Sequence, residues 1–132
     1  MKYLLDTNIC IYLIKKKPEQ VIKKLKTLNI SDVAISAITL SELEYGVQKS
    51  KSKGQNKIAL IEFLAPLLIL SYDDKASVAY GKLRAYLESI GKSIGSLDML
   101  IAAHALSENF TLVTNNVKEF NLVPDLKIEN WV

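Results

Sequence analysis

Short β-forming stretches alternate with helical patterns along the chain, and this alternation most constrains how the chain can fold. Strand-like runs occupy residues 2–5, 33–36, 67–70 and 111–114, with a weak fifth near 127–129. Apolar residues recurring every three or four positions predict helices between them, at residues 8–16, 18–28, 37–49, 55–65, 74–90 and 97–108. The order predicts an α/β fold in one domain, residues 1–132. Its mostly parallel central sheet would have four to five strands, with helices on both faces.

Composition limits the class of protein. At 132 residues and 49% hydrophobic, the chain can bury one core. No apolar run reaches the length of a membrane span, and the N-terminus lacks a secretory signal, so we expect a cytoplasmic protein that does not enter the membrane. A single cysteine, Cys10, excludes a disulfide framework, and a single histidine disfavours a zinc centre.

Positive charge is concentrated in the first half of the chain. Residues 1–60 contain 11 Lys and 5 acidic residues, whereas residues 61–132 contain 6 Lys or Arg and 9 acidic residues. The lysines cluster at positions 15–17, 23–26 and 49–57. Such a surface can bind a polyanion such as RNA, and it is equally consistent with ordinary solvated helix faces.

Residues typical of helix ends mark several boundaries. Start signals for four of the helices are Pro18, Ser36, Asp73 and Ser96, and Gly54 and Gly91 fall where helices are expected to be separated or stopped. We interpret Asp73 and Asp74 as capping residues, His104 as a core histidine with its hydrogen bonds satisfied, and Arg84 as a partner of Glu88 four residues on.

Several carboxylates lie where strands end or apolar helices begin. Asp6 follows the first strand and can bind a cation, cap the next helix, or do both. Periodicity does not choose between Glu42 and Glu44, and either can be a surface residue. Asp98 lies in the first turn of an apolar helix, where the dipole favours its ionised form in a structural role as well as in a functional one.

Polar residues also follow the fourth strand. Asn116 and Glu119 match an Asn-x-x-Glu capping box, and they can alternatively complete an acidic site. In a parallel sheet, residues at the carboxyl ends of the strands meet at one edge, where ligands bind. Clustered carboxylates there would bind Mg²⁺ or Mn²⁺ and activate a water for attack on a phosphodiester.

An ordered set of motifs resembles a known family. The motifs lie at residues 4–8 (LLDTN), 41–46 (SELEYG), 79–84 (AYGKLR), 94–104 (IGSLDMLIAAH), 112–116 (LVTNN), 119–120 (EF) and 129–131 (ENW). Together they look like a PIN-domain ribonuclease of the VapC toxin group, over essentially the whole chain.

The resemblance implies a metal-dependent endoribonuclease that cleaves RNA, often a particular tRNA, and is held inactive by a cognate antitoxin. It also implies homodimers and a higher assembly with the antitoxin. By motif, Asp6 and Asp98 are the main metal ligands and Glu42, rather than Glu44, is the third acid. Asn116 occupies the place of a fourth acid, with Glu119 as a nearby source of the missing charge. Ser96 stands where relatives usually carry Pro.

Three other functions remain as alternatives. An aspartyl phosphatase would need a second Asp at position 8, which is Asn8. A phospho-receiver domain would need paired acids after the first strand, and these are absent. A non-catalytic RNA- or partner-binding module on the same fold is the main alternative, and retention of Asp6, Glu42 and Asp98 argues against it.

Overall fold

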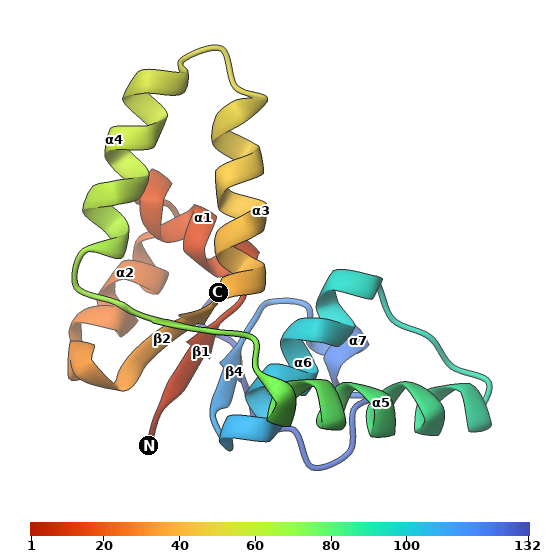
Figure 1. The fold of residues 1–132 in the computed structure, drawn as a ribbon. Helices are drawn as coiled ribbons and strands as arrows, with labels where there is room; N and C mark the ends of the chain where they lie inside the picture. The colour runs from red at the N-terminus through yellow and green to blue at the C-terminus, as the bar shows by residue number, and fades with distance from the viewer.

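A five-stranded, all-parallel sheet forms the centre of the molecule in the computed structural model, which describes residues 1–132 (Figure 1). Its order is β3-β2-β1-β4-β5. The strands are β1 (Tyr3–Leu5), β2 (Val33–Ser36), β3 (Leu68–Leu70), β4 (Thr111–Val113) and β5 (Ile128–Glu129). All five lie within the stretches predicted from the sequence, so the predicted parallel α/β architecture is confirmed.

Seven α-helices connect the strands. They are α1 (Thr7–Lys15), α2 (Glu19–Lys26), α3 (Ala37–Gln48), α4 (Lys53–Leu64), α5 (Asp74–Ser89), α6 (Ser96–Glu108) and α7 (Val117–Phe120), with a short 3₁₀ turn at Ile30–Asp32. The first six agree with the predicted helices to within two residues at each end. None of the helices is both long and apolar enough to cross a membrane.

Two hydrophobic cores lie on opposite faces of the sheet. Alternate residues of β1 point to opposite faces: Tyr3 and Leu5 join a core with α1 to α4, whereas Leu4 joins a core with α5, α6 and Phe120. Each buried Leu or Ile contributes about 1.5–3 kcal/mol. Helices α3 and α4 rise from the sheet as a hairpin, and α5 and α6 extend away from it to the other side (Figure 1).

Some helix boundaries differ from the prediction. Ser36 and Asp73 do cap α3 and α5, accepting hydrogen bonds from the backbone N–H groups of Ile38 and Ala76. Ser96 does not cap α6, because the helix already begins at Ser96 and Gly95 occupies the capping position without a side chain.

The two glycine predictions had different outcomes. Gly91, at φ 69°, follows the end of α5 as predicted, in a conformation that favours glycine. The prediction that Gly54 separates two helices was wrong: Gly54 is the second residue of α4, and the chain turns before it.

The topological switch point of the sheet, where the strand order reverses, lies between β1 and β4. From β1 the chain proceeds to β2 and β3 on one side, and then crosses to β4 on the other. The Asp6 N–H donates to the carbonyl of Val113 at 3.0 Å, which ties the end of β1 to the end of β4. Ligands of open parallel sheets bind beyond the carboxyl ends of the strands at such a point.

Candidate active site

Asp6 is buried at the carboxyl end of β1. Only 4% of the residue is exposed, and its Oδ1 accepts a hydrogen bond from the Ile9 N–H at 2.9 Å, which caps α1. Burial raises the pKa of this carboxyl, with a smaller contribution from the Glu42 charge, while a hydrogen bond from the Thr114 side chain acts in the opposite direction. The capping interpretation is therefore confirmed, and the second carboxylate oxygen is not used by the cap.

Glu42 is directed toward the same edge from α3. Its Oε1 accepts a hydrogen bond from the Thr7 hydroxyl at 2.6 Å, which links α3 to the residue next to Asp6. Glu44 instead forms a hydrogen-bonded ion pair with Lys57 of α4. The two glutamates that periodicity left undecided therefore have different surroundings, and only Glu42 lies beside Asp6.

Asp98 is the third residue of α6, one position later than expected. Burial raises the pKa of its carboxyl to about 6, followed by the negative charges of Glu119 and Asp6 and by a hydrogen bond with Glu119. An added Cβ at Gly95 would lie 3.6 Å from both the Asp98 Oδ2 and the Glu119 Oε1. These are ordinary van der Waals distances, so Gly95 lies directly beside both carboxylates.

Glu119 and Asn116 do not form the predicted capping box. The Asn116 backbone N–H donates to the Thr114 hydroxyl, and its side-chain Nδ2 donates to the Glu119 Oε2 at 2.9 Å. The Glu119 Oε1 accepts from the Gly95 N–H at 2.7 Å. The hydrogen bond from Asn116 and the one from Gly95 lower the pKa of Glu119. The motif is used to hold Glu119 against the start of α6 instead of starting α7.

The carboxylates influence one another without forming a ready-made cluster. No three His, Cys, Asp or Glu side chains stand close enough together to form a metal-binding group. The charges of Asp6, Glu42 and Glu119 nevertheless all raise the pKa of Asp98. A divalent cation would offset this repulsion, and the donors are the carboxylate oxygens that magnesium and manganese prefer. The residues present therefore fit a hard divalent cation.

Other sequence predictions concerned residues outside this edge. Arg84 forms the expected interaction with Glu88 and also donates to the Tyr80 hydroxyl. His104 is in the core as predicted, with its Nδ1 2.8 Å from the Ser36 hydroxyl, but its Nε2 has no hydrogen-bond partner. The expectation that its hydrogen bonds are satisfied was therefore only half right.

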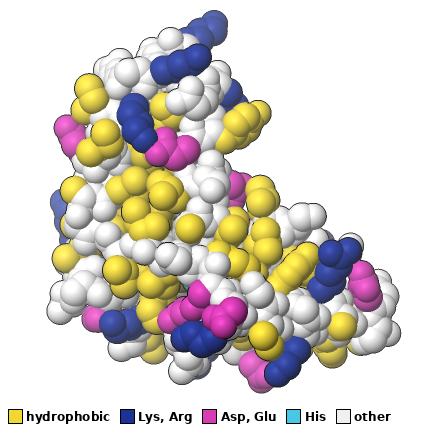
Figure 2. Space-filling model, in the orientation of Figure 1, with side chains coloured by type: hydrophobic (Ala, Val, Ile, Leu, Met, Phe, Trp, Pro, Cys, Tyr) yellow, Lys and Arg dark blue, Asp and Glu magenta, His cyan; other side chains and the backbone are white.

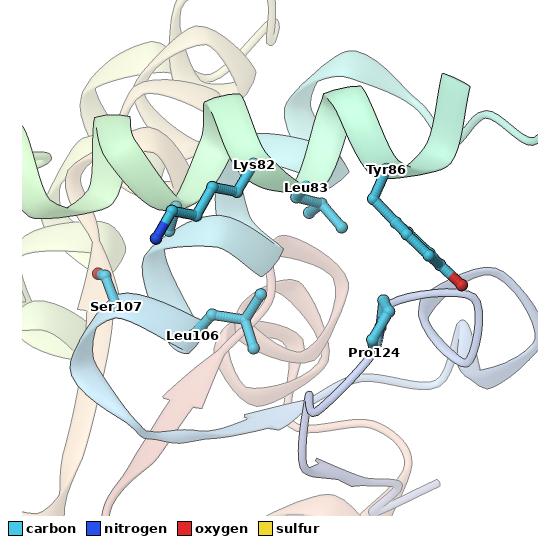
Figure 3. A pocket seen from close by; sticks show the side chains of 7 residues that line it. Lys82, Leu83, Tyr86, Leu106, Ser107 and Pro124 are labelled. Atoms are coloured by element: carbon cyan, nitrogen blue, oxygen red, sulfur yellow. The ribbon is translucent and has the colours of Figure 1, made fainter. Parts of the chain in front are cut away.

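A cavity of about 290 Å³ lies elsewhere, between α5, the end of α6 and the segment after α7 (Figure 3). Leu106, which lines it, is eight residues after Asp98 on α6, or about 12 Å along the helix axis. No carboxylate lines this cavity. Its residues are Ala79, Lys82, Leu83, Tyr86, Leu106, Ser107 and Pro124. The acidic edge, and not this cavity, has the chemistry expected of a phosphodiesterase.

Comparison with known proteins identifies the family of the chain. The sequence profile described as PIN domain matches residues 3–126. The ribonuclease VapC2 of Rickettsia felis is 51% identical over 132 residues, which cover 99% of this chain and 98% of that protein. The chain belongs to the VapC group of PIN-domain ribonucleases. It is also 42% identical to the tRNA(fMet)-specific endonuclease VapC of Salmonella typhimurium, over 99% of this chain and 98% of that protein.

A solved structure extends the similarity to the backbone of this PIN domain. The crystal structure of VapBC2 from Rickettsia felis, bound to a DNA fragment from its promoter, superimposes with a TM-score of 0.94. That chain is 50% identical, and the match covers 100% of both chains. The chain is therefore a nuclease of this family by sequence and by fold.

Three residues that contact the candidate site acids were not singled out by the sequence analysis. They are Thr7, which binds Glu42, Thr114, which contacts Asp6, and Gly95, which binds Glu119. Thr7 and Glu42 are 35 residues apart in sequence, and Gly95 and Glu119 are 24 apart. Local spacing carries no signal for such pairs.

Proposed function

We propose that this PIN domain is a metal-dependent endoribonuclease that hydrolyses RNA phosphodiester bonds, with a tRNA as its substrate. The observation that carries the proposal is that Asp6, at the carboxyl end of β1, and Glu42, bound to its neighbour Thr7, lie near enough to Asp98 for their charges to raise its pKa. The tRNA substrate is supported by the 42% identical relative named as a tRNA(fMet)-specific endonuclease. RNA as substrate also places the proposed activity in the cytoplasm.

Asp6 and Asp98 would bind a Mg²⁺ or Mn²⁺ ion, with Glu42 as the third acid. When bound, such an ion supplies Lewis-acid activation of the phosphodiester and lowers the pKa of a water. The chain's own contribution is orientation. The Ile9 N–H fixes one oxygen of Asp6, and the Thr7 hydroxyl fixes one oxygen of Glu42.

Glu119 is the proposed fourth acid, and Asn116 is the residue that positions it. The Asn116 amide holds Glu119 Oε2 while the Gly95 N–H holds Oε1, so both oxygens are oriented before substrate binds. This arrangement would allow Asn116 to replace the fourth acid without loss of the negative charge from the site.

The partner proposed for this chain is a cognate antitoxin. The solved relatives from Rickettsia felis and Salmonella typhimurium are VapBC complexes bound to DNA. A cavity of about 370 Å³ between α1, α3 and α4 is lined mainly by apolar residues and includes Glu42. An apolar antitoxin segment bound there would cover one carboxylate of the site, which would explain inhibition.

A homodimer is the proposed assembly. Large apolar side chains are exposed on β3 and α5, including Leu68, Ile69 and Val78. Figure 2 shows hydrophobic side chains gathered over the α3–α4 hairpin and in the corner between it and α5. Exposed apolar patches of this kind commonly mark protein interfaces. Light scattering of the purified protein tests the dimer, and a monomer at micromolar concentration would contradict it.

Variants of Glu42 and Glu44 distinguish the proposed nuclease from the alternative, a non-catalytic binding module. Purified protein is incubated with total RNA and Mg²⁺ or Mn²⁺, with and without EDTA. We expect discrete cleavage that EDTA stops, a loss of at least about 100-fold in Glu42→Gln, and near wild-type activity in the matched Glu44→Gln variant. Metal-independent cleavage, or equal activity of the two variants, would contradict the proposal. Binding of RNA without cleavage would favour the module.

A further inference from the structure

One face of α3 extends from the acidic edge of the sheet out to the tip of the α3–α4 hairpin. Ile38, Glu42, Tyr45 and Lys49 follow one another at spacings of four, three and four residues, so they share one face of the helix. Ile38, at the inner end, packs against the core that contains α6. This face therefore begins on the α6 side, passes the acid Glu42 and ends among lysines.

Tyr45 is the exposed aromatic residue on this face. The residue is 65% exposed, although it lies only one helical turn from Glu42. The ammonium group of Lys49, one turn further on, lies 5.2 Å from the centre of the Tyr45 ring. A cation at this distance from an aromatic ring is attracted to it, and the high exposure leaves ring surface free for a second group.

The lysines beyond Tyr45 are available to an anion. Lys49, Lys51 and Lys53 form no ion pair, whereas Lys57 is paired with Glu44 and Lys24 with Glu129. Lysines without acidic partners can neutralise phosphates and release counterions. Proteins that bind single-stranded RNA combine such positive charge with aromatic side chains on which bases stack.

We propose that Tyr45 is a stacking platform for a base next to the bond that is cut, and that Lys49 contacts a phosphate of the same strand. Along the helix axis Tyr45 lies about 4.5 Å from Glu42 and Lys49 about 10 Å from it, at about 1.5 Å per residue. The ligand is an unpaired RNA segment such as a loop, because only an unstacked base can lie on the ring.

This inference rests on the proposed ribonuclease function, and the experiment separates the two. Steady-state cleavage of an RNA hairpin is measured for the wild type, Tyr45→Ala, Tyr45→Phe and the control Tyr86→Ala, an exposed tyrosine on α5. We expect KM to rise about 5- to 100-fold in Tyr45→Ala with little change in kcat. Tyr45→Phe, which keeps the ring, should retain the wild-type KM, as should the control.

A spectroscopic signature tests stacking directly. Tyr45→Trp places an exposed indole on α3, whereas the natural Trp131 is only 4% exposed. We expect fluorescence quenching when RNA is added to this variant in EDTA.

The salt dependence of RNA binding tests the phosphate contact. In Lys49→Gln, the slope of log RNA affinity against log salt concentration should become shallower by about 0.7. The control Lys127→Gln lies at the opposite edge of the sheet, before β5, and should leave this slope unchanged.

The outcomes are distinct. Wild-type protein that cleaves no RNA would overturn the proposed function itself. Cleavage with an unchanged KM in Tyr45→Ala, or no quenching in Tyr45→Trp, would overturn the stacking platform alone. A change from dimer to monomer in Tyr45→Ala by light scattering would assign the residue to a contact with a second copy of the chain, and would also overturn it.

Discussion

The acidic edge should reduce the stability of the metal-free protein, and Asp98→Asn tests this directly. Burial and the charges of Glu119 and Asp6 raise the pKa of the Asp98 carboxyl from 3.8 to about 6. Between these two values the folded protein keeps a proton that the unfolded chain has released. Stability is therefore lost as pH rises through this window, and the full loss is present above pH 6.

The magnitude follows from the same two values. A difference from 3.8 to about 6 corresponds to about 3 kcal/mol for a fully buried group. Asp98 is only partly buried, so we reduce this by half for solvent screening, to about 1.5 kcal/mol. For a chain of this length that is about 5 °C in Tm. The uncharged amide of Asn can also donate a hydrogen bond to Glu119, as the protonated Asp98 does.

The assay is thermal denaturation followed by circular dichroism in EDTA. Asp98→Asn should melt about 5 °C above the wild type at pH 7.5, and the difference should largely disappear at pH 4. Saturating Mg²⁺ should raise the Tm of the wild type more than that of the variant, because ligand binding stabilises the folded state. A variant that melts below the wild type in EDTA at pH 7.5, or a difference independent of pH, would refute the reasoning.

Three further variants test individual contacts. Thr7→Val removes the hydroxyl that binds Glu42 and should lower kcat/KM for RNA about 10-fold, whereas Thr7→Ser keeps the hydroxyl and should keep kcat/KM near the wild-type value. Equal losses of kcat/KM in both variants would contradict the proposed role of the hydroxyl. Glu119→Gln removes one of the charges beside Asp98, so the pKa of Asp98 should fall below about 6 when it is followed by carboxyl NMR of the metal-free protein. An unchanged pKa would argue against an electrostatic interaction between Glu119 and Asp98. Ser36→Ala removes both the cap of α3 and the hydrogen-bond partner of the buried His104 Nδ1, so it should lower Tm by about 10 °C. The control Ser41→Ala, at an exposed site on the same helix, should change Tm little.

The sheet was predictable because its signals are local. Residues 33–36 contain the β-branched residues Val33 and Ile35 and are buried throughout, and β2 has the same bounds. The position of Asp6 followed in the same way, since a residue directly after a parallel strand must lie at the carboxyl edge. The family resemblance then separated Glu42 from Glu44, which periodicity alone could not do.

The errors at the start of α6 and after β4 came from contacts between distant parts of the chain. Asn116 and Glu119 have the spacing of a capping box, but the Gly95 N–H, 24 residues earlier, binds the Glu119 carboxylate instead. Ser96 has the chemistry of a cap, yet it is the first residue of α6, and Gly95, whose N–H donates to Glu119, takes the capping position. Helix-end rules describe the preferences of an isolated segment, and a contact with a distant residue can override them.

Helix N-termini help to hold the acids Asp6, Asp98 and Glu119 at the same edge of the sheet. Asp6 caps α1, Asp98 lies in the first turn of α6, and Glu119 accepts from the Gly95 N–H just before that turn. The positive ends of two helix dipoles therefore meet at the carboxyl edge, and each favours a negative group by about 0.3–1 kcal/mol. Glu42, in the middle of α3, has no such end nearby and is held by the Thr7 hydroxyl. Backbone dipoles offset part of the repulsion but not all of it, because the pKa of Asp98 remains raised. In the proposed function, a divalent cation bound at these carboxylates would offset the repulsion that remains.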